Sequence, residues 1–96
     1  MRITKHLTKV PEVCRFFGII IQMYGNDHIP PHFHAIFNEY HAVVEIETGE
    51  ILLGSLPSKQ LKFVQVWASI HADELTENFN LLRAEVQTFN KIKPLQ

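Results

Sequence analysis

Hydrophobic and polar residues change their spacing once along this chain of 96 residues, close to Ser55. Before Ser55, short runs of β-branched and aromatic residues contain alternating apolar and polar positions. After it, apolar residues recur every three or four positions. Alternation is typical of strands, and the longer period is typical of helices. The pattern therefore predicts an α+β fold, with an antiparallel meander of about four strands followed by two amphipathic helices packed on one face.

Turn signals between the apolar runs divide the first half of the chain into four predicted strands. The first run, FFGIIIQMY, follows Cys14 and is apolar on both alternating faces, which predicts a strand buried on both sides. It ends at the turn cluster Gly25-Asn26-Asp27. Two further turns, at Asn38-Glu39 and Thr48-Gly49, separate the next three strand-like runs.

A two-residue turn at Asn38-Glu39 would fix how its flanking strands pair, whereas a three-residue loop would shift the register by one. The two-residue turn predicts four opposite pairs: Phe37 with Tyr40, Ile36 with His41, His34 with Val43, and His32 with Glu45. The core face would then carry Phe33, Ala35, Phe37, Tyr40, Ala42, Val44 and Ile46. The other face would carry His32, His34, His41, Glu45 and Glu47. In the last strand, Ile51 and Leu53 are expected to face the helices.

The first helix is predicted to follow Ser55, with Pro57 in its first turn. Its apolar stripe, spaced i, i+3, i+4, i+7, consists of Phe63, Val66, Trp67 and Ile70. Asp73 is a candidate N-cap for the second helix, and Pro94 limits its length. The second stripe consists of Leu75, Phe79, Leu82, Val86 and Phe89. The predicted organisation is an N-terminal arm at 1–12, a single domain at 13–92 and a C-terminal tail at 93–96.

Composition restricts the partners and the cellular compartment that can be expected for the protein. Lys plus Arg total 9 and Asp plus Glu total 10, so the chain lacks the positive field that draws a protein to phosphate backbones, and nucleic-acid binding is disfavoured. A single cysteine, Cys14, cannot form an internal disulfide, and the first residues do not follow the pattern of a secretion signal. The apolar runs are far shorter than the ~20 residues that span a bilayer. We therefore expect a soluble cytoplasmic protein without a membrane partner.

The candidate chemistry lies in the segment NDHIPPHFHA, residues 26–35. In a strand, His32 and His34 point to the same face about 6.6 to 6.8 Å apart along the backbone, so their imidazoles can converge on one ion. A divalent metal such as zinc accepts imidazole nitrogens, and the candidate further ligands are Asp27, His28, His41 and Glu45. Three protein ligands and an open position would form a hydrolytic centre.

The same histidines also have a structural interpretation. Histidines on an exposed sheet face are often solvated or bonded to carboxylates, and Pro30-Pro31 can simply stiffen the entrance to a strand. His71 follows the stripe of the first helix, where a helix-end role is favoured over ligation. If a site exists, we expect His28, His32 and His34 to converge, with Asp27 orienting one ring.

Three stretches together resemble a known family: RFFGIIIQMYGNDHIPPHFHA, EIETGEILLGSLP and VWASIHADELTENF. The chain is similar, from about Val13 to the end of the second helix, to the small bacterial domain-of-unknown-function 4160 family. The resemblance singles out the motif residues Asn26, Asp27, His28, Pro30, Pro31, His32, Phe33 and His34, with His71 as a further histidine. It implies a bacterial protein whose gene lies beside that of another small protein, as in toxin-antitoxin pairs.

Two functions from different classes compete. The first is the protein-binding component of such a two-gene system, which would bind the product of the adjacent gene. The second is a divalent-metal-dependent hydrolase, resembling a ribonuclease toxin, that uses the histidine cluster. Few cationic residues lie near the motif to hold a phosphate backbone, which disfavours the second. A homodimer joined through sheet edges is a third, structural alternative.

Overall fold

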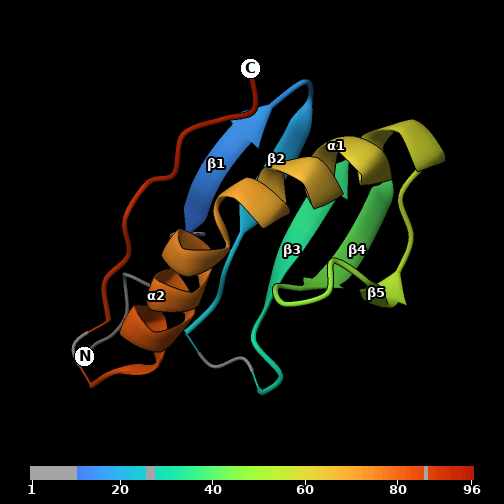
Figure 1. Ribbon diagram of the computed structural model, residues 1–96. Coiled ribbons are helices and arrows are strands. Elements are labelled where there is room, and N and C mark those ends of the chain that lie inside the picture. Colours follow the sequence, from blue (N-terminus) through green and yellow to red (C-terminus); the bar gives the residue numbers. More distant parts are fainter. Residues whose placement is uncertain (1–10, 26–27, 86) are drawn as a thin grey trace, which may run out of the picture.

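The computed structural model describes residues 11–25, 28–85 and 87–96, and its helices and strands confirm the α+β fold (Figure 1). The strands are β1 (Glu12–Phe16), β2 (Ile19–Gln22), β3 (His32–Phe37), β4 (Tyr40–Glu45) and β5 (Ile51–Gly54). They form one antiparallel sheet in the order β1-β2-β3-β4-β5. The helices α1 (Ser58–Ile70) and α2 (Ala72–Arg83) follow and lie on the same side of the sheet (Figure 1). Neither is long and apolar enough to cross a bilayer.

The first predicted strand is in fact a hairpin, which is why the sheet has five strands. Phe16 pairs with Ile19, and the two residues between them, Phe17 and Gly18, have φ values of 50° and 78°. Positive φ at both positions is the geometry of a tight hairpin turn that matches the twist of its strands. In β2 buried and half-buried residues alternate, so this strand is not buried on both sides. The turn was not predicted because Phe17 is apolar and continues the hydrophobic run on both sides of it.

The predicted register of β3 and β4 is confirmed at all four predicted pairs. The two-residue turn forms because Asn38 adopts a φ of 54°, a conformation that Asn tolerates better than most residues. Most of the predicted core face is also confirmed, since Phe33, Ala35, Ala42, Val44 and Ile46 are buried. Tyr40, at the turn, is an exception because its side chain is 38% exposed.

The last strand corrects the expectation for Leu53. Ile51 pairs with Val44 and packs against the core, but Leu53 pairs with Val43, because an irregularity at Leu52 shifts the register by one. One extra residue reverses the facing of every later side chain in a strand. Leu53 therefore lies on the face away from the helices and is 71% exposed.

The first helix forms where the sequence predicts it, but it buries a different stripe. Trp67 is fully buried as expected, and its companions in the core are Val64 and Ala68. Val66 and Ile70, which the periodicity places in the core stripe, are 52% and 62% exposed. The helix begins after Pro57, which occupies the N-cap position instead of the first turn.

The second helix is shorter than predicted. His71 precedes it at the N-cap position, so Asp73 lies in the first turn. Leu75, Phe79 and Leu82 are buried as predicted. The helix ends at Arg83, which places Phe89 beyond it, and Val86 lies outside the described residues.

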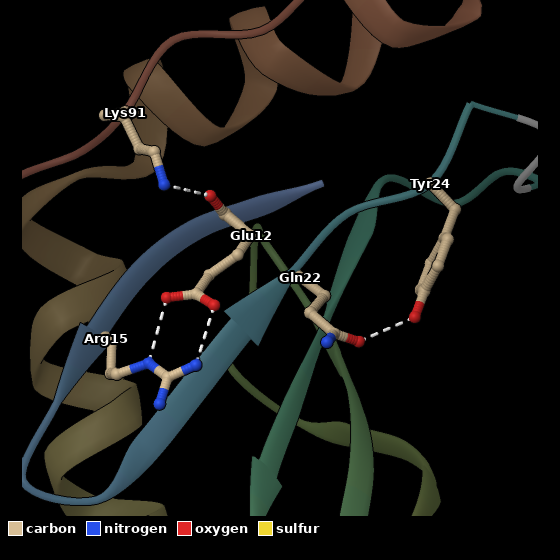
Figure 2. Close-up of polar contacts among 5 residues, drawn as sticks. All are labelled: Glu12, Arg15, Gln22, Tyr24 and Lys91. Atoms are coloured by element: carbon tan, nitrogen blue, oxygen red, sulfur yellow. Dashed lines mark hydrogen bonds and ion pairs between the residues drawn. The ribbon is translucent and has the colours of Figure 1, made fainter. Parts of the chain in front are cut away.

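The C-terminal strap, residues 87–96, runs beside β1 (Figure 1). The Ile92 backbone N–H donates to the Val13 carbonyl at 2.9 Å, and the Lys91 Nζ donates to the Glu12 carbonyl at 2.8 Å (Figure 2). The Trp67 indole N–H donates to the Lys93 carbonyl at 2.8 Å. The C-terminal strap therefore covers the edge of the sheet at β1, where it is held by these hydrogen bonds. Residues 1–10, most of the predicted arm, lie outside the described part of the chain.

Candidate functional site

The histidine motif lies at the start of β3, where the chain enters the sheet. Asn26 and Asp27 lie outside the described residues, and His28 is exposed. The Pro31 carbonyl accepts a hydrogen bond from the Ile46 N–H at 3.0 Å, which joins the proline segment to the turn after β4. The proline pair thus fixes the entrance to β3.

Within the motif, Phe33 and His32 have separate surroundings. Phe33 is fully buried, with its ring 5.8 Å from that of Trp67, so it belongs to the core. His32 Nδ1 lies 2.8 Å from the Pro30 carbonyl oxygen. Because a carbonyl can only accept, Nδ1 carries the proton in this bond, and a neutral ring then has its lone pair on Nε2. The His32 ring also packs 5.6 Å from that of Phe79.

His34 is the centre of a cluster on the face of the sheet away from the helices, except that His32, at the end of β3, also reaches Phe79 of α2 and so does not lie wholly on that face as the sequence predicts. Its Nδ1 lies 2.9 Å from Nε2 of His41, on the neighbouring strand. Its ring lies 4.7 Å from that of Tyr24, 5.5 Å from that of His32 and 5.2 Å from that of His41. We call these four residues, Tyr24, His32, His34 and His41, the outer histidine cluster.

The His34–His41 contact limits how many protons the pair can hold. A hydrogen bond between two imidazole nitrogens needs one donor and one acceptor, so the facing nitrogens share a single proton. Protonating both rings would place two N–H groups face to face and break the bond. The pair can therefore pass a proton or, when each neutral ring carries its proton on the far nitrogen, offer two lone pairs to a cation.

Tyr24 is a member of the cluster that the sequence analysis missed. It follows the end of β2, and its hydroxyl donates to Gln22 Oε1 at 2.6 Å (Figure 2). Gln22 pairs with His34, so this bond aligns the Tyr24 ring beside the His34 ring. The i, i+2 spacing of Gln22 and Tyr24 could have indicated that the two side chains lie on the same face. The predicted strand had no assigned neighbour, however, so neither residue could be placed beside His34.

The two remaining candidate residues, Glu45 and His71, have hydrogen-bond partners other than His34. Glu45 pairs with His32 in the sheet, and its Oε1 accepts a hydrogen bond from the Thr48 hydroxyl at 3.0 Å. His71 lies at the junction of the two helices, where Nδ1 bonds the Glu74 carboxylate and the ring packs 5.6 Å from that of Trp67. Thus His41 joins the cluster, while His71 is bonded on the helix side.

Two observations bear on the chemistry available to the site. Within residues 11–25, 28–85 and 87–96, no group of three or more His, Cys, Asp or Glu side chains is arranged to hold a metal ion. Burial raises the pKa of the Cys14 thiol, which keeps it protonated and therefore a poor nucleophile. The chemistry at hand is that of imidazole, phenol and amide groups on an open sheet face.

Comparison with known proteins gives one match. The family model described as Domain of unknown function (DUF4160) matches residues 18–80, from the β1–β2 turn into α2. No curated protein and no solved structure matches the chain. Because the family match spans more than half of the sequence and includes the whole histidine motif, this chain belongs to the DUF4160 family.

Proposed function

We propose that this protein is the protein-binding component of a two-gene, toxin-antitoxin-like system, and that it binds the product of the adjacent gene. The observation that carries the proposal is the outer sheet face, the side of the sheet away from both helices (Figure 1). Two rows of paired residues cross it: Ile20, Ile36 and His41 in one, and Gln22, His34, Val43 and Leu53 in the other.

The composition of this face suits a protein partner. Its apolar side chains lie beside imidazole and amide groups. Both rows continue into β1, with Arg15 opposite Ile20 and Glu12 opposite Gln22, so the charged residues of these rows lie at the β1 edge of the face and not at its centre. Interface centres are depleted in charged residues and combine apolar contact with a few hydrogen bonds. Leu53, 71% exposed, and His41, also exposed, would be covered by the partner. A catalytic role would need an oriented nucleophile, and the Cys14 thiol is buried.

The test is co-expression with the adjacent gene product, followed by gel filtration at micromolar concentration. We expect a complex, since a micromolar Kd corresponds to about 8.2 kcal/mol, which an interface of ordinary size supplies. Leu53→Glu should weaken it about tenfold or more, because it buries a charge in the interface. Ile70→Glu is the matched control, since Ile70 is 62% exposed on α1. Unchanged elution volumes, or a complex sensitive only to Ile70→Glu, would reject the proposal, and a doubled mass without partner would favour a homodimer.

A divalent-metal-dependent hydrolase is the second candidate, and the His34–His41 contact favours it. Zinc binds imidazole nitrogen at about 2.0–2.1 Å, so two tetrahedral ligands lie roughly 3.3–3.4 Å apart. His34 Nδ1 and His41 Nε2 are 2.9 Å apart, so a small separation of the rings would admit an ion. His28 and His32 are the candidate third ligands, and bound water would then supply the nucleophile.

Titration of the purified protein with zinc, nickel and manganese tests this second candidate. A specific site should stabilise the wild type by about 2.7 kcal/mol at a metal concentration a hundredfold above Kd. His32→Ala combined with His34→Ala should abolish this gain. His71→Gln should retain it, since His71 is bonded to Glu74 on the helix side. If all three proteins melt identically at every metal concentration, the metal site is rejected, and the hydrolase function that depends on it is rejected as well.

A further inference from the structure

A cavity of about 400 Å³ lies at the end of the sheet near the motif prolines. Pro30 and Pro31 line it from the segment before β3, Ile46 from the turn after β4, and Ala72 and Thr76 from the first turns of α2. Its volume is at the lower end of the range for ligand-binding pockets. Three separate parts of the chain therefore supply a largely apolar lining.

Backbone hydrogen bonds hold this lining in place. The Ile46 N–H donates to the Pro31 carbonyl at 3.0 Å, which ties two of the lining segments together. The turn after β4 is closed by the Gly49 N–H, which donates to the Glu45 carbonyl at 2.8 Å. A cavity whose walls are already fixed loses little conformational entropy when it is filled.

The charged residues that line the cavity are acidic. Glu45 and Glu47 also line it, and Glu45 Oε1 is held by the Thr48 hydroxyl at 3.0 Å. Asp73 and Glu74 occupy the first turn of α2, next to Ala72. Among the described residues that line the cavity there is no Lys or Arg. Glu74 is bonded to His71, so the carboxylates that the cavity itself offers are those of Glu45 and Glu47, beside an otherwise largely apolar lining.

These features are complementary to a cation on an apolar stem. The methylene groups of a long basic side chain would pack on proline, isoleucine and alanine surfaces, while its charged end met the carboxylates. A guanidinium is more weakly hydrated than an ammonium, so an apolar lining costs it less, and its planar donors pair with carboxylates in a bidentate manner. The chemistry favours arginine over lysine.

We propose that this cavity receives an arginine side chain of the partner protein, with its guanidinium at Glu45 and Glu47. The identity of the partner rests on the proposed function, but the chemistry of the cavity does not. Glu45 pairs with His32 in the sheet, so the cavity adjoins the outer histidine cluster. A partner seated on the outer sheet face could therefore insert a side chain here.

The probe for this proposal is the capped peptide acetyl-Gly-Arg-Gly-amide, titrated into the full chain at low ionic strength and followed by amide chemical shifts. We expect saturable shifts at Ile46, Glu47, Ala72 and Thr76. The same peptide with citrulline, which is neutral and nearly isosteric, should bind about tenfold more weakly or worse, since the ion pair is lost. A lysine peptide should fall between the two.

Variants of the chain complete the experiment. Glu47→Gln, at an exposed position, should weaken arginine binding about tenfold. Glu39→Gln is the matched control, because Glu39 is exposed in the β3–β4 turn at the opposite end of these strands and carries the same charge. Thr76→Phe should abolish binding by filling the cavity. If that variant does not fold, Glu47→Gln decides the matter.

The proposal is overturned by equal binding of the citrulline peptide, by equal or tighter binding of the lysine peptide, by equal weakening with Glu39→Gln, or by unchanged arginine binding with Glu47→Gln. The two hypotheses fail separately. If the adjacent gene product binds but Glu47→Gln affects neither that complex nor the arginine peptide, the cavity proposal fails alone. If the peptide binds as expected but no complex forms with that product, the proposed partner is wrong and the cavity assignment stands.

Discussion

Glu12 and Arg15, at the start of the sheet, form an ion pair with two hydrogen bonds. The Glu12 carboxylate accepts hydrogen bonds from Arg15 Nε at 3.0 Å and from Nη2 at 2.8 Å (Figure 2). These bonds, together with the charge of Arg15, lower the pKa of Glu12 below its ordinary value of 4.5. Lys91 binds the backbone carbonyl of the same residue, so β1 and the C-terminal strap meet here.

The lowered pKa of Glu12 predicts a dependence of stability on pH. A carboxyl whose pKa is lower in the folded state stabilises the fold above its unfolded pKa, and this contribution is lost as the pH falls through the folded pKa. Glu12→Gln should therefore be less stable than the wild type at about pH 6, and the difference should shrink by about pH 3. Urea denaturation at several pH values measures it. A difference that stays constant over this range would contradict the assignment.

Sequence reasoning placed His32, His34 and His41 on one face because alternation in a strand is dictated by the backbone. It did not predict the bond between His34 and His41. These residues are not opposite one another, since His34 pairs with Val43 and His41 pairs with Ile36. Their contact is diagonal, and the reach of diagonal side chains depends on the twist of the strands and on rotamers. The shared face of the three histidines could therefore be predicted from the sequence, but the hydrogen bond between His34 and His41 could not.

At the scale of the helix, periodicity identified α1 but not the side that it buries. Two stripes overlap in its sequence and share Trp67: one contains Val66 and Ile70, and the other contains Val64 and Ala68. Packing against the sheet selects the second stripe, so the choice is made by tertiary contacts that periodicity cannot supply. Part of the first stripe is still used, because the Phe63 ring lies 5.0 Å from that of Phe17 at the β1–β2 turn.

In the strands, the two wrong predictions, of the strand number and of the side on which Leu53 lies, each come from one or two residues. The Phe17-Gly18 turn divides one apolar run into two strands, and the irregularity at Leu52 turns Leu53 outward. The turn and the irregularity both lie within apolar runs and do not alter their composition. An alternation of period two therefore reveals neither of them. The turn at Asn38-Glu39 was predictable because Asn is one of the few residues that commonly adopt positive φ.

At the scale of the whole molecule, the sheet is completed by parts of the chain outside the family match. The match covers residues 18–80, whereas β1 and the C-terminal strap lie on either side of it. Ile92 of the strap is 4% exposed and packs in the common core. Asn78 of α2, itself buried, donates to the Asn90 carbonyl and accepts from the Asn90 N–H, both at 2.8 Å. The strap is thus bonded to the sheet and to both helices.

We expect the loss of the strap to destabilise the whole domain. A chain that ends at Asn90 would keep the bonds to Asn78 but lose Ile92 from the core, and the buried Trp67 indole would lose the Lys93 carbonyl. Removing a buried isoleucine side chain costs about 2–5 kcal/mol, as Ile92→Ala should show, and an unsatisfied buried donor costs about 1–3 kcal/mol more.

Urea denaturation and gel filtration measure both consequences of this truncation. The chain ending at Asn90 should unfold at a lower urea concentration than Ile92→Ala, because it loses hydrogen bonds as well as apolar contacts. Its β1 edge, freed from the Ile92 N–H bond to Val13, should pair with other molecules and raise the apparent mass. A chain ending at Leu95 is the control, since it keeps Ile92, the Lys93 carbonyl and Leu95, which packs against the core, and it should remain close to the wild type. Equal urea midpoints for the chains ending at Asn90 and Leu95 would mean that the strap lies on the sheet without stabilising it.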